Sequence, residues 1–167
     1  MMYTSHYLSP VGDLTMTGTE SALTSLYFSS QKHLPDLLDD ELIKRETEVF
    51  TKTKLYLDSY FEGKRPSLLP KIEIHTTPFR HNVYEILSTI GYGKTLTYGD
   101  IEKNLINKYK LKAMSAQAVG NAVGHNPICI IIPCHRVVGK DGALTGFAGG
   151  LETKKKLLSL EGIVFKE

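Results

Sequence analysis

The chain has 167 residues, of which 41% are hydrophobic and 23% charged, a balance typical of a globular protein rather than a disordered one. Its longest apolar run, Ile128 to Ile132, is too short to cross a membrane, and its first residues lack the features of a signal peptide. We therefore expect a cytoplasmic protein without membrane contact. The two cysteines, Cys129 and Cys134, lie five residues apart in one extended stretch, which excludes a disulfide framework.

The charge is divided unevenly between the two halves of the chain. Residues 1–75 contain 8 Lys plus Arg against 11 Asp plus Glu, a net −3, whereas residues 76–167 contain 12 against 7, a net +5. A positive second half suits an anionic partner such as nucleic acid, although many surfaces of this charge have no such partner. Charge alone leaves both interpretations open.

The first half predicts a small sheet and a helix. Three short apolar runs between Tyr3 and Phe28 are separated by turn residues and indicate an antiparallel sheet. A polar stretch from Gln31 to Asp40 follows, and apolar residues at helical spacing predict a helix from about Glu46 to Phe61. The proline-containing stretch from Lys64 to His75 is typical of a linker, so we predict an N-terminal domain of residues 1–75.

The second half, residues 76–167, predicts a mostly helical domain. One helix begins at Pro78 and ends before Gly91. A second opens at Thr97, and a third, from Ser115 to Val123, is rich in alanine and glycine, so the two suggest a helix-turn-helix. Small side chains in the third helix would allow close approach to a sugar-phosphate backbone, or equally a tight packing between helices.

The last segments place one cysteine at the end of a buried run. The run from Ile128 to Ile132 predicts a β-strand that ends on Pro133, so that Cys134 lies where buried backbone emerges. A last helix is predicted to begin near Thr153 and to leave Glu161 at its C-terminal end.

Cys134 and His135 are the candidate reactive pair. A free thiol has a pKa of about 8.5 and reacts as the thiolate, so a nucleophilic cysteine needs a base or a cation nearby. Adjacent residues on extended backbone point to opposite sides, which favours a water between the sulfur and the ring. A carboxylate would fix the histidine tautomer, and Glu161 is the candidate. A lone cysteine is more often a buried small hydrophobe, so spacing alone leaves the function open.

A longer pattern around these residues resembles a known family. Its segments are Thr77-Pro78-Phe79, Gly93 to Gly99, Ala118-Val119-Gly120, Asn126-Pro127, Ile132 to Val138 and Gly146 to Gly162, with Ser9 to Gly12 and Tyr60 to Gly63 in the first half. They span nearly the whole chain and are similar to the O6-alkylguanine-DNA alkyltransferases, also called methylated-DNA–protein-cysteine methyltransferases.

The resemblance implies an α/β protein with a small N-terminal antiparallel sheet-and-helix domain, RNase H-like, and a mostly helical, winged-helix-like C-terminal domain. It implies DNA repair by direct reversal, in which the alkyl group of O6-alkylguanine in double-stranded DNA moves to the protein, restoring guanine and inactivating the acceptor. O4-alkylthymine is a second candidate substrate. The protein is expected to be a monomer and to need no cofactor.

Five residues receive chemical roles from the resemblance. Cys134 is the acceptor, His135 is a base that acts through water, and Glu161 orients His135. Asn126 braces the turn between the DNA-binding helix and the active-site segment. Tyr98 is the phenol that helps to turn the nucleotide and sits by the base.

A second group is expected to contact guanine or DNA. The backbone of Cys134 and Val137 and the loop from Gly146 to Gly150 would frame the base, with aromatic and small side chains on its wall. Arg136 is expected to be structural, although it borders the site. The whole predicted binding set is Ser115, Gln117, Ala118, Arg136, Val137, Phe147, Ala148 and Lys154.

The recognition helix departs from the family pattern. In this family that helix enters the minor groove, and an arginine from it replaces the extruded base, but the matching position here is Gln117. Glutamine lacks the stacking plane and charge of guanidinium, so we expect slower or weaker repair of duplex DNA. Asn121 or a nearby lysine could compensate, and a register shifted by one helical turn is the other alternative.

Other functions fit the sequence less well. Some larger relatives bind zinc in the N-terminal domain, but that half has no cysteine and only His6, His33 and His75, so no metal is expected. A non-catalytic lesion binder would lack the acceptor cysteine, which is present. A cysteine hydrolase would need an oxyanion hole and would turn over repeatedly. A transcription regulator would be expected to carry a further domain.

Overall fold

The computed structural model describes residues 1–32, 34, 41–112 and 114–167. His33 and most of the predicted polar stretch lie outside the described residues. By their internal contacts the residues divide into two compact units, Met1–His75 and Thr76–Glu167.

The N-terminal unit is built on a four-stranded sheet. Its strands are β1 (Met2–Ser9), β2 (Gly12–Gly18), β3 (Leu23–Phe28) and β4 (Leu42–Lys44), in the order β3-β2-β1-β4. The first three strands pair antiparallel, as predicted, but β4 pairs parallel with β1, so the sheet is mixed. Three residues are too few to show the alternation by which a strand is recognised, which is why β4 was not predicted.

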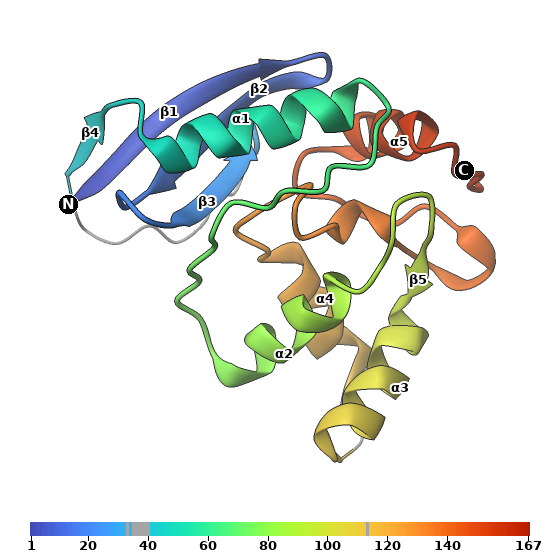
Figure 1. Cartoon of the computed structure of the whole chain (residues 1–167). Coiled ribbons are helices and arrows are strands. Elements are labelled where there is room, and N and C mark those ends of the chain that lie inside the picture. The colour runs from blue at the N-terminus through green and yellow to red at the C-terminus, as the bar shows by residue number, and fades with distance from the viewer. Residues whose placement is uncertain (33, 35–40, 113) are drawn as a thin grey trace. The chain divides into compact units, whose positions relative to one another are not determined.

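Helix α1 (Glu48–Phe61) lies across one face of this sheet (Figure 1). It begins two residues later than predicted because the side chain of Thr47 accepts a hydrogen bond from the Phe50 N–H and caps the helix. Phe50, Leu57 and Tyr60 are fully buried on its inner side. Burying such side chains is the main favourable contribution to folding of this unit.

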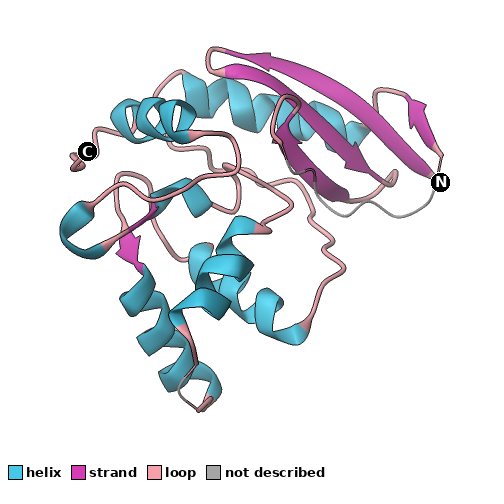
Figure 2. Cartoon of the chain, turned by 180° about the vertical axis from the view of Figure 1, so that it is seen from behind, coloured by secondary structure: helices cyan, strands magenta, loops and turns pink. Residues whose placement is uncertain are grey.

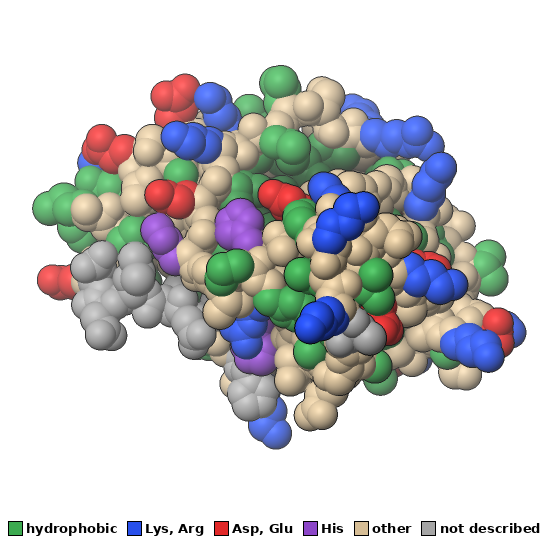
Figure 3. All heavy atoms as spheres, turned by 90° about the horizontal axis from the view of Figure 1, so that it is seen from below, with side chains coloured by type: hydrophobic (Ala, Val, Ile, Leu, Met, Phe, Trp, Pro, Cys, Tyr) green, Lys and Arg blue, Asp and Glu red, His purple; other side chains and the backbone are tan. Residues whose placement is uncertain are grey.

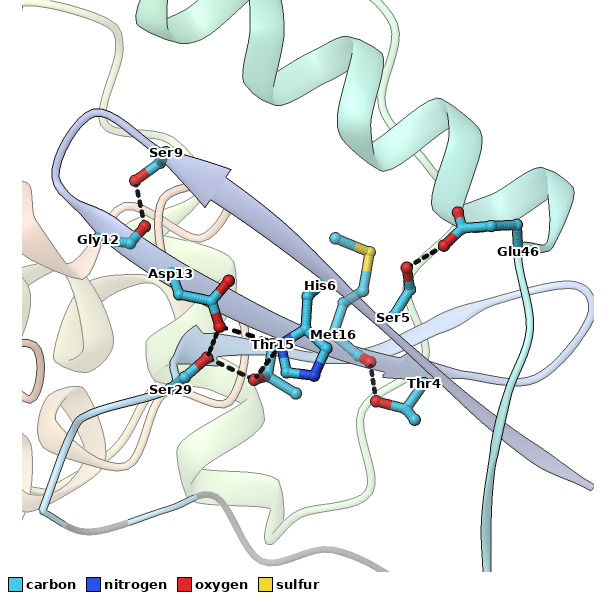
Figure 4. A network of polar contacts seen from close by, with 10 residues as sticks. All are labelled: Thr4, Ser5, His6, Ser9, Gly12, Asp13, Thr15, Met16, Ser29 and Glu46. Atoms are coloured by element: carbon cyan, nitrogen blue, oxygen red, sulfur yellow. Dashed lines mark hydrogen bonds and ion pairs between the residues drawn. The ribbon is translucent and has the colours of Figure 1, made fainter.

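A polar network ties the first three strands together (Figure 4). Asp13 accepts hydrogen bonds from Ser29 Oγ at 2.6 Å and from His6 Nδ1 at 3.0 Å, and Thr15 Oγ1 lies 2.6 Å from Ser29 Oγ. These bonds lower the pKa of Asp13, led by the bond from Ser29. His6 therefore has an ordinary hydrogen-bonding role in the sheet.

The C-terminal unit is mostly helical, and strands are few in it (Figure 2). Its helices are α2 (Pro78–Leu87), α3 (Tyr98–Tyr109), α4 (Ala116–Gly124) and α5 (Leu151–Leu160). The first three pack against one another, with Val83, Ile101 and Val119 buried in their core. Short 3-10 helices span Cys134–Arg136 and Lys140–Gly142, and the strands β5 (Leu96–Thr97) and β6 (Val137–Val138) form a parallel pair.

The helix starts follow the capping chemistry of the sequence. Thr97 and Asp100 form a capping box at α3, and the Ser115 side chain accepts from the Ala118 N–H at α4. Helix α5 begins at Leu151, two residues before the predicted Thr153, because Gly150 at φ 95 provides the left-handed conformation that lets the chain enter the helix there.

The segment before Cys134 is not the predicted strand. Residues 128–132 are buried, as expected, but they form turns in which the Ile131 N–H donates to the Cys129 carbonyl at 2.7 Å. Ile130 has φ 67, a left-handed conformation that β-branched residues rarely adopt. The expectation that Cys129 and Cys134 share one extended stretch is therefore also wrong, and both are free thiols.

Neither a membrane-spanning helix nor a metal-binding cluster occurs among the described residues. No helix in the described ranges is long and apolar enough to cross a membrane. No group of three or more His, Cys, Asp or Glu side chains is placed to hold a metal ion among the residues that the structure describes.

Candidate active site

Cys134 opens a 3-10 helix at the end of the buried turn, with 8% of its surface exposed. Asn126 spans this turn, because its Nδ2 donates to the Ile132 carbonyl at 2.7 Å and its Oδ1 accepts from the Ile128 N–H at 3.0 Å. One side chain thus fixes both ends of the segment that delivers the cysteine. The bracing role that the resemblance implies for Asn126 stays a prediction, and these two bonds are compatible with it.

His135 is completely buried and lies against Glu161. Its Nε2 is 2.5 Å from Glu161 Oε2, although 26 residues separate the two in the chain. Glu161 comes from the C-cap of α5, where the sequence placed it. Because Nε2 meets the carboxylate, proton exchange between the ring and the thiol would use Nδ1.

Glu161 is also the centre of a buried charge cluster. Its Oε1 accepts from Arg136 Nε at 2.8 Å and from the Gly93 N–H at 2.9 Å, and Arg136 Nη1 donates to the Ile90 carbonyl at 2.7 Å. Burial acts to raise the pKa of Glu161, but the bonds from His135, Arg136 and Gly93 outweigh it and lower the pKa to about 2. The Arg136 guanidinium therefore links the Glu161 carboxylate to the backbone at Ile90 inside the protein.

The thiol and the imidazole are both kept neutral by burial. Burial raises the pKa of Cys134, while the Asn126 amide, the Lys154 ammonium and the backbone N–H groups of Cys134 and His135 oppose it. Burial likewise lowers the pKa of His135, against the opposing effect of Glu161. Both shifts favour the uncharged forms, a thiol at Cys134 and a neutral imidazole at His135.

Lys154, on α5, is buried behind the site with 1% of its surface exposed. Its Nζ donates to the Val137 carbonyl at 2.6 Å, the Thr145 carbonyl at 3.3 Å and Thr145 Oγ1 at 3.1 Å. Burial lowers its pKa to about 8. Thr145 Oγ1 also lies 3.0 Å from the hydroxyl of Tyr98, so Tyr98, Val137 and Lys154 meet in one network.

The predicted wall residues lie on the loop between β6 and α5. Phe147 is half-buried and Ala148 is exposed, and the Phe147 carbonyl accepts from the Gly150 N–H at 2.9 Å. No role in the site was predicted for Thr145, Gly93 or Ile90, although Gly93 lies in one of the segments that carry the resemblance. Gly93 and Ile90 act through backbone atoms, which carry no signature in side-chain chemistry, and Thr145 is an ordinary loop threonine until its partners are known.

The predicted DNA-binding residues of α4 are accessible. Ser115 and Gln117 are exposed and Ala118 is half-buried, and Asn121 is exposed on the following turn. On the face seen in Figure 3, lysine and arginine side chains are scattered among neutral ones with a few acidic groups between them. On this face the lysine and arginine side chains are therefore not gathered in one patch.

Comparison with known proteins identifies the family. Residues 78–163 match the family model of the 6-O-methylguanine DNA methyltransferase DNA-binding domain, and residues 2–74 match that of its ribonuclease-like domain. The chain belongs to this family. A methylated-DNA–protein-cysteine methyltransferase of Methanosarcina acetivorans is 39% identical over 96% of this chain and 99% of that protein, and one of Haemophilus influenzae is 38% identical over 98% and 88%.

A solved structure of the family has the same fold. OGT of Mycobacterium tuberculosis, crystallised in complex with DNA, has a TM-score of 0.81 and 36% identity over 95% of this chain and 92% of that one. The predicted fold class is confirmed, with the one correction that the N-terminal sheet is mixed.

Proposed function

We propose that this methyltransferase repairs double-stranded DNA by moving the alkyl group from O6 of a modified guanine onto the sulfur of its own Cys134. The observation that carries the proposal is the buried Cys134 beside the His135–Glu161 pair, in a chain of this family. The crystallised relative bound to DNA supports the choice of partner.

The reaction is a displacement at the alkyl carbon. The thiol proton passes through a water to Nδ1 of His135, and Glu161 stabilises the imidazolium that forms. The sulfur then bonds to the alkyl carbon as the bond between that carbon and O6 breaks. The electron pair of the broken bond stays on guanine, which takes up a proton. The product is a thioether that water does not cleave, so each chain acts once.

The substrate has to leave the helix before it can react. Flipping a base out costs roughly a few kcal/mol. Helix α4 would lie in the minor groove with its small side chains, and Gln117 would fill the gap in the stack. Val137, Phe147 and Ala148 would then frame the flipped guanine. We further propose that the protein acts as a monomer.

The experiment is a transfer assay with excess duplex that carries one O6-methylguanine. Intact mass should rise by one methyl group per chain and then stop. Cys134→Ala should gain nothing, whereas Cys129→Ala, the matched control at the other cysteine, should still be methylated. Repeated turnover would indicate a hydrolase, and tight binding without mass gain would indicate a lesion sensor.

A further inference from the structure

We infer that Thr145 is a positioning residue for methyl transfer, because its hydroxyl joins the buried Lys154 to Tyr98 and sets the direction in which the Tyr98 hydroxyl donates. The inference rests on the proposed function. It concerns a residue that neither the motif around Cys134 nor its spacing points to.

The direction of the hydrogen bonds starts from the lysine. An ammonium group has three N–H donors and no acceptor, and those of Lys154 meet the Val137 carbonyl, the Thr145 carbonyl and Thr145 Oγ1. Thr145 Oγ1 therefore accepts from Lys154. Three acceptors for three donors also explain how an ammonium can remain charged at a site with 1% exposure.

The threonine then has one hydrogen of its own to donate. Within the described part of the chain, Thr145 Oγ1 has two hydrogen-bond partners, Lys154 Nζ and the Tyr98 hydroxyl at 3.0 Å. Lys154 can only donate and so occupies one lone pair of Thr145 Oγ1, and we infer that the threonine uses its one hydrogen on the Tyr98 oxygen, its other partner. The phenol oxygen is thus an acceptor in this bond, and its own hydrogen is left to donate to a base in the site.

This arrangement suits the reaction. Negative charge moves onto guanine as the carbon–O6 bond breaks, and a phenol that already donates toward the base disperses that charge without reorienting. A chain of hydrogen bonds that begins at a cation strengthens the last donor in it. Thr145 and Lys154 would thus act on the base only through Tyr98. Lys154 also donates to the Val137 carbonyl.

A double-mutant cycle tests the inference. Thr145→Val removes the hydroxyl at nearly constant shape and should slow single-turnover methyl transfer about tenfold, the usual effect of losing one hydrogen bond in a transition state. Thr145→Ser keeps the hydroxyl and should recover the rate to within about threefold of wild type. In a Tyr98→Phe background, Thr145→Val should cause no further slowing, because its effect passes through the phenol.

The outcomes separate this inference from the proposed function. If wild type accepts no methyl group, the proposed function fails. If wild type is methylated and Thr145→Val reacts at the same rate, only the inference fails. The inference is also overturned if Thr145→Val slows transfer equally in wild type and in the Tyr98→Phe background. In that case Thr145 would act only by holding Lys154 or the loop in place. Melting temperatures of wild type and the four variants check that each is folded.

Discussion

At the scale of single residues, Gln117 is the departure with the clearest consequence. It lies exposed in the first turn of α4, where the family resemblance leads us to expect an arginine. A glutamine can hydrogen-bond the orphaned partner base, but it cannot stack on its neighbours as a planar cation does.

We predict that Gln117→Arg raises the single-turnover rate on duplex DNA about three- to tenfold, a range that corresponds to roughly 1 kcal/mol. On single-stranded substrate, where no base has to be replaced, the rate should change much less. Asn121→Arg, one helical turn away, is the matched control. An unchanged duplex rate in Gln117→Arg together with a faster Asn121→Arg would mean that the register of α4 is shifted.

The reactive residues show what a sequence can reveal at this scale. Cys134, His135 and Glu161 were predicted because their side-chain chemistry is complementary, and the structure brings His135 and Glu161 together across 26 residues. Arg136 was expected to be structural and Lys154 to belong to the binding set, but the sequence did not predict that both are buried. Apart from Glu161 and the Thr145 hydroxyl, their partners are backbone carbonyls, which every residue has, so no pattern in the sequence could predict those contacts.

At the scale of elements, the turn before Cys134 depends on one side chain. Asn126 uses both its amide nitrogen and its amide oxygen to hold the segment between α4 and Cys134. Removing both bonds leaves a buried carbonyl and a buried N–H without that partner, which costs about 1–3 kcal/mol for each group.

We therefore predict that Asn126→Ala lowers the free energy of unfolding by about 2–6 kcal/mol and slows methyl transfer. Asn126→Asp keeps the acceptor for the Ile128 N–H and loses the donor to the Ile132 carbonyl, so it should lie between Asn126→Ala and wild type. Urea titration measures stability, and the transfer assay measures the rate. A stable, fully active Asn126→Ala protein would contradict the bracing role.

The same turn shows where prediction of elements failed. Helix starts were predicted within about two residues, because capping residues such as Thr97 and Ser115 act locally. The apolar run 128–132 indicated burial correctly but could not indicate conformation, since a continuous apolar run has no period. The reversal at Ile130 and the Asn126 bonds depend on tertiary contacts that become visible only in the structure.

At the scale of the whole molecule, the buried charge cluster makes stability depend on pH. The pKa of Glu161 is about 2 in the folded protein against an ordinary 4.5, so its contribution is present above pH 4.5 and is lost as the pH falls toward 2. Burial lowers the pKa of His135 below its ordinary 6.5 in the folded protein. Below pH 6.5 the His135 ring therefore binds a proton more readily in the unfolded chain than in the folded one, which favours unfolding. Both groups destabilise the fold in acid.

We predict that the free energy of unfolding falls steadily below pH 6.5, with the Glu161 part, roughly 2–3 kcal/mol, lost below pH 4.5. Glu161→Gln should be less stable at pH 7 and should show a shallower dependence between pH 4.5 and 3. Glu152→Gln, at an exposed carboxylate, is the control and should follow wild type. Parallel curves for wild type and Glu161→Gln would show that this carboxylate titrates normally in the folded state.

The central claim is that the alkyl group ends on Cys134, and peptide mapping tests it most directly. After reaction with an O6-methylguanine duplex and digestion with trypsin, the peptide from 113 to 136 contains both cysteines. We predict fragment ions that carry one methyl group on Cys134 and none on Cys129. Methylation of Cys129, or a peptide without methyl while the lesion disappears, would contradict the account.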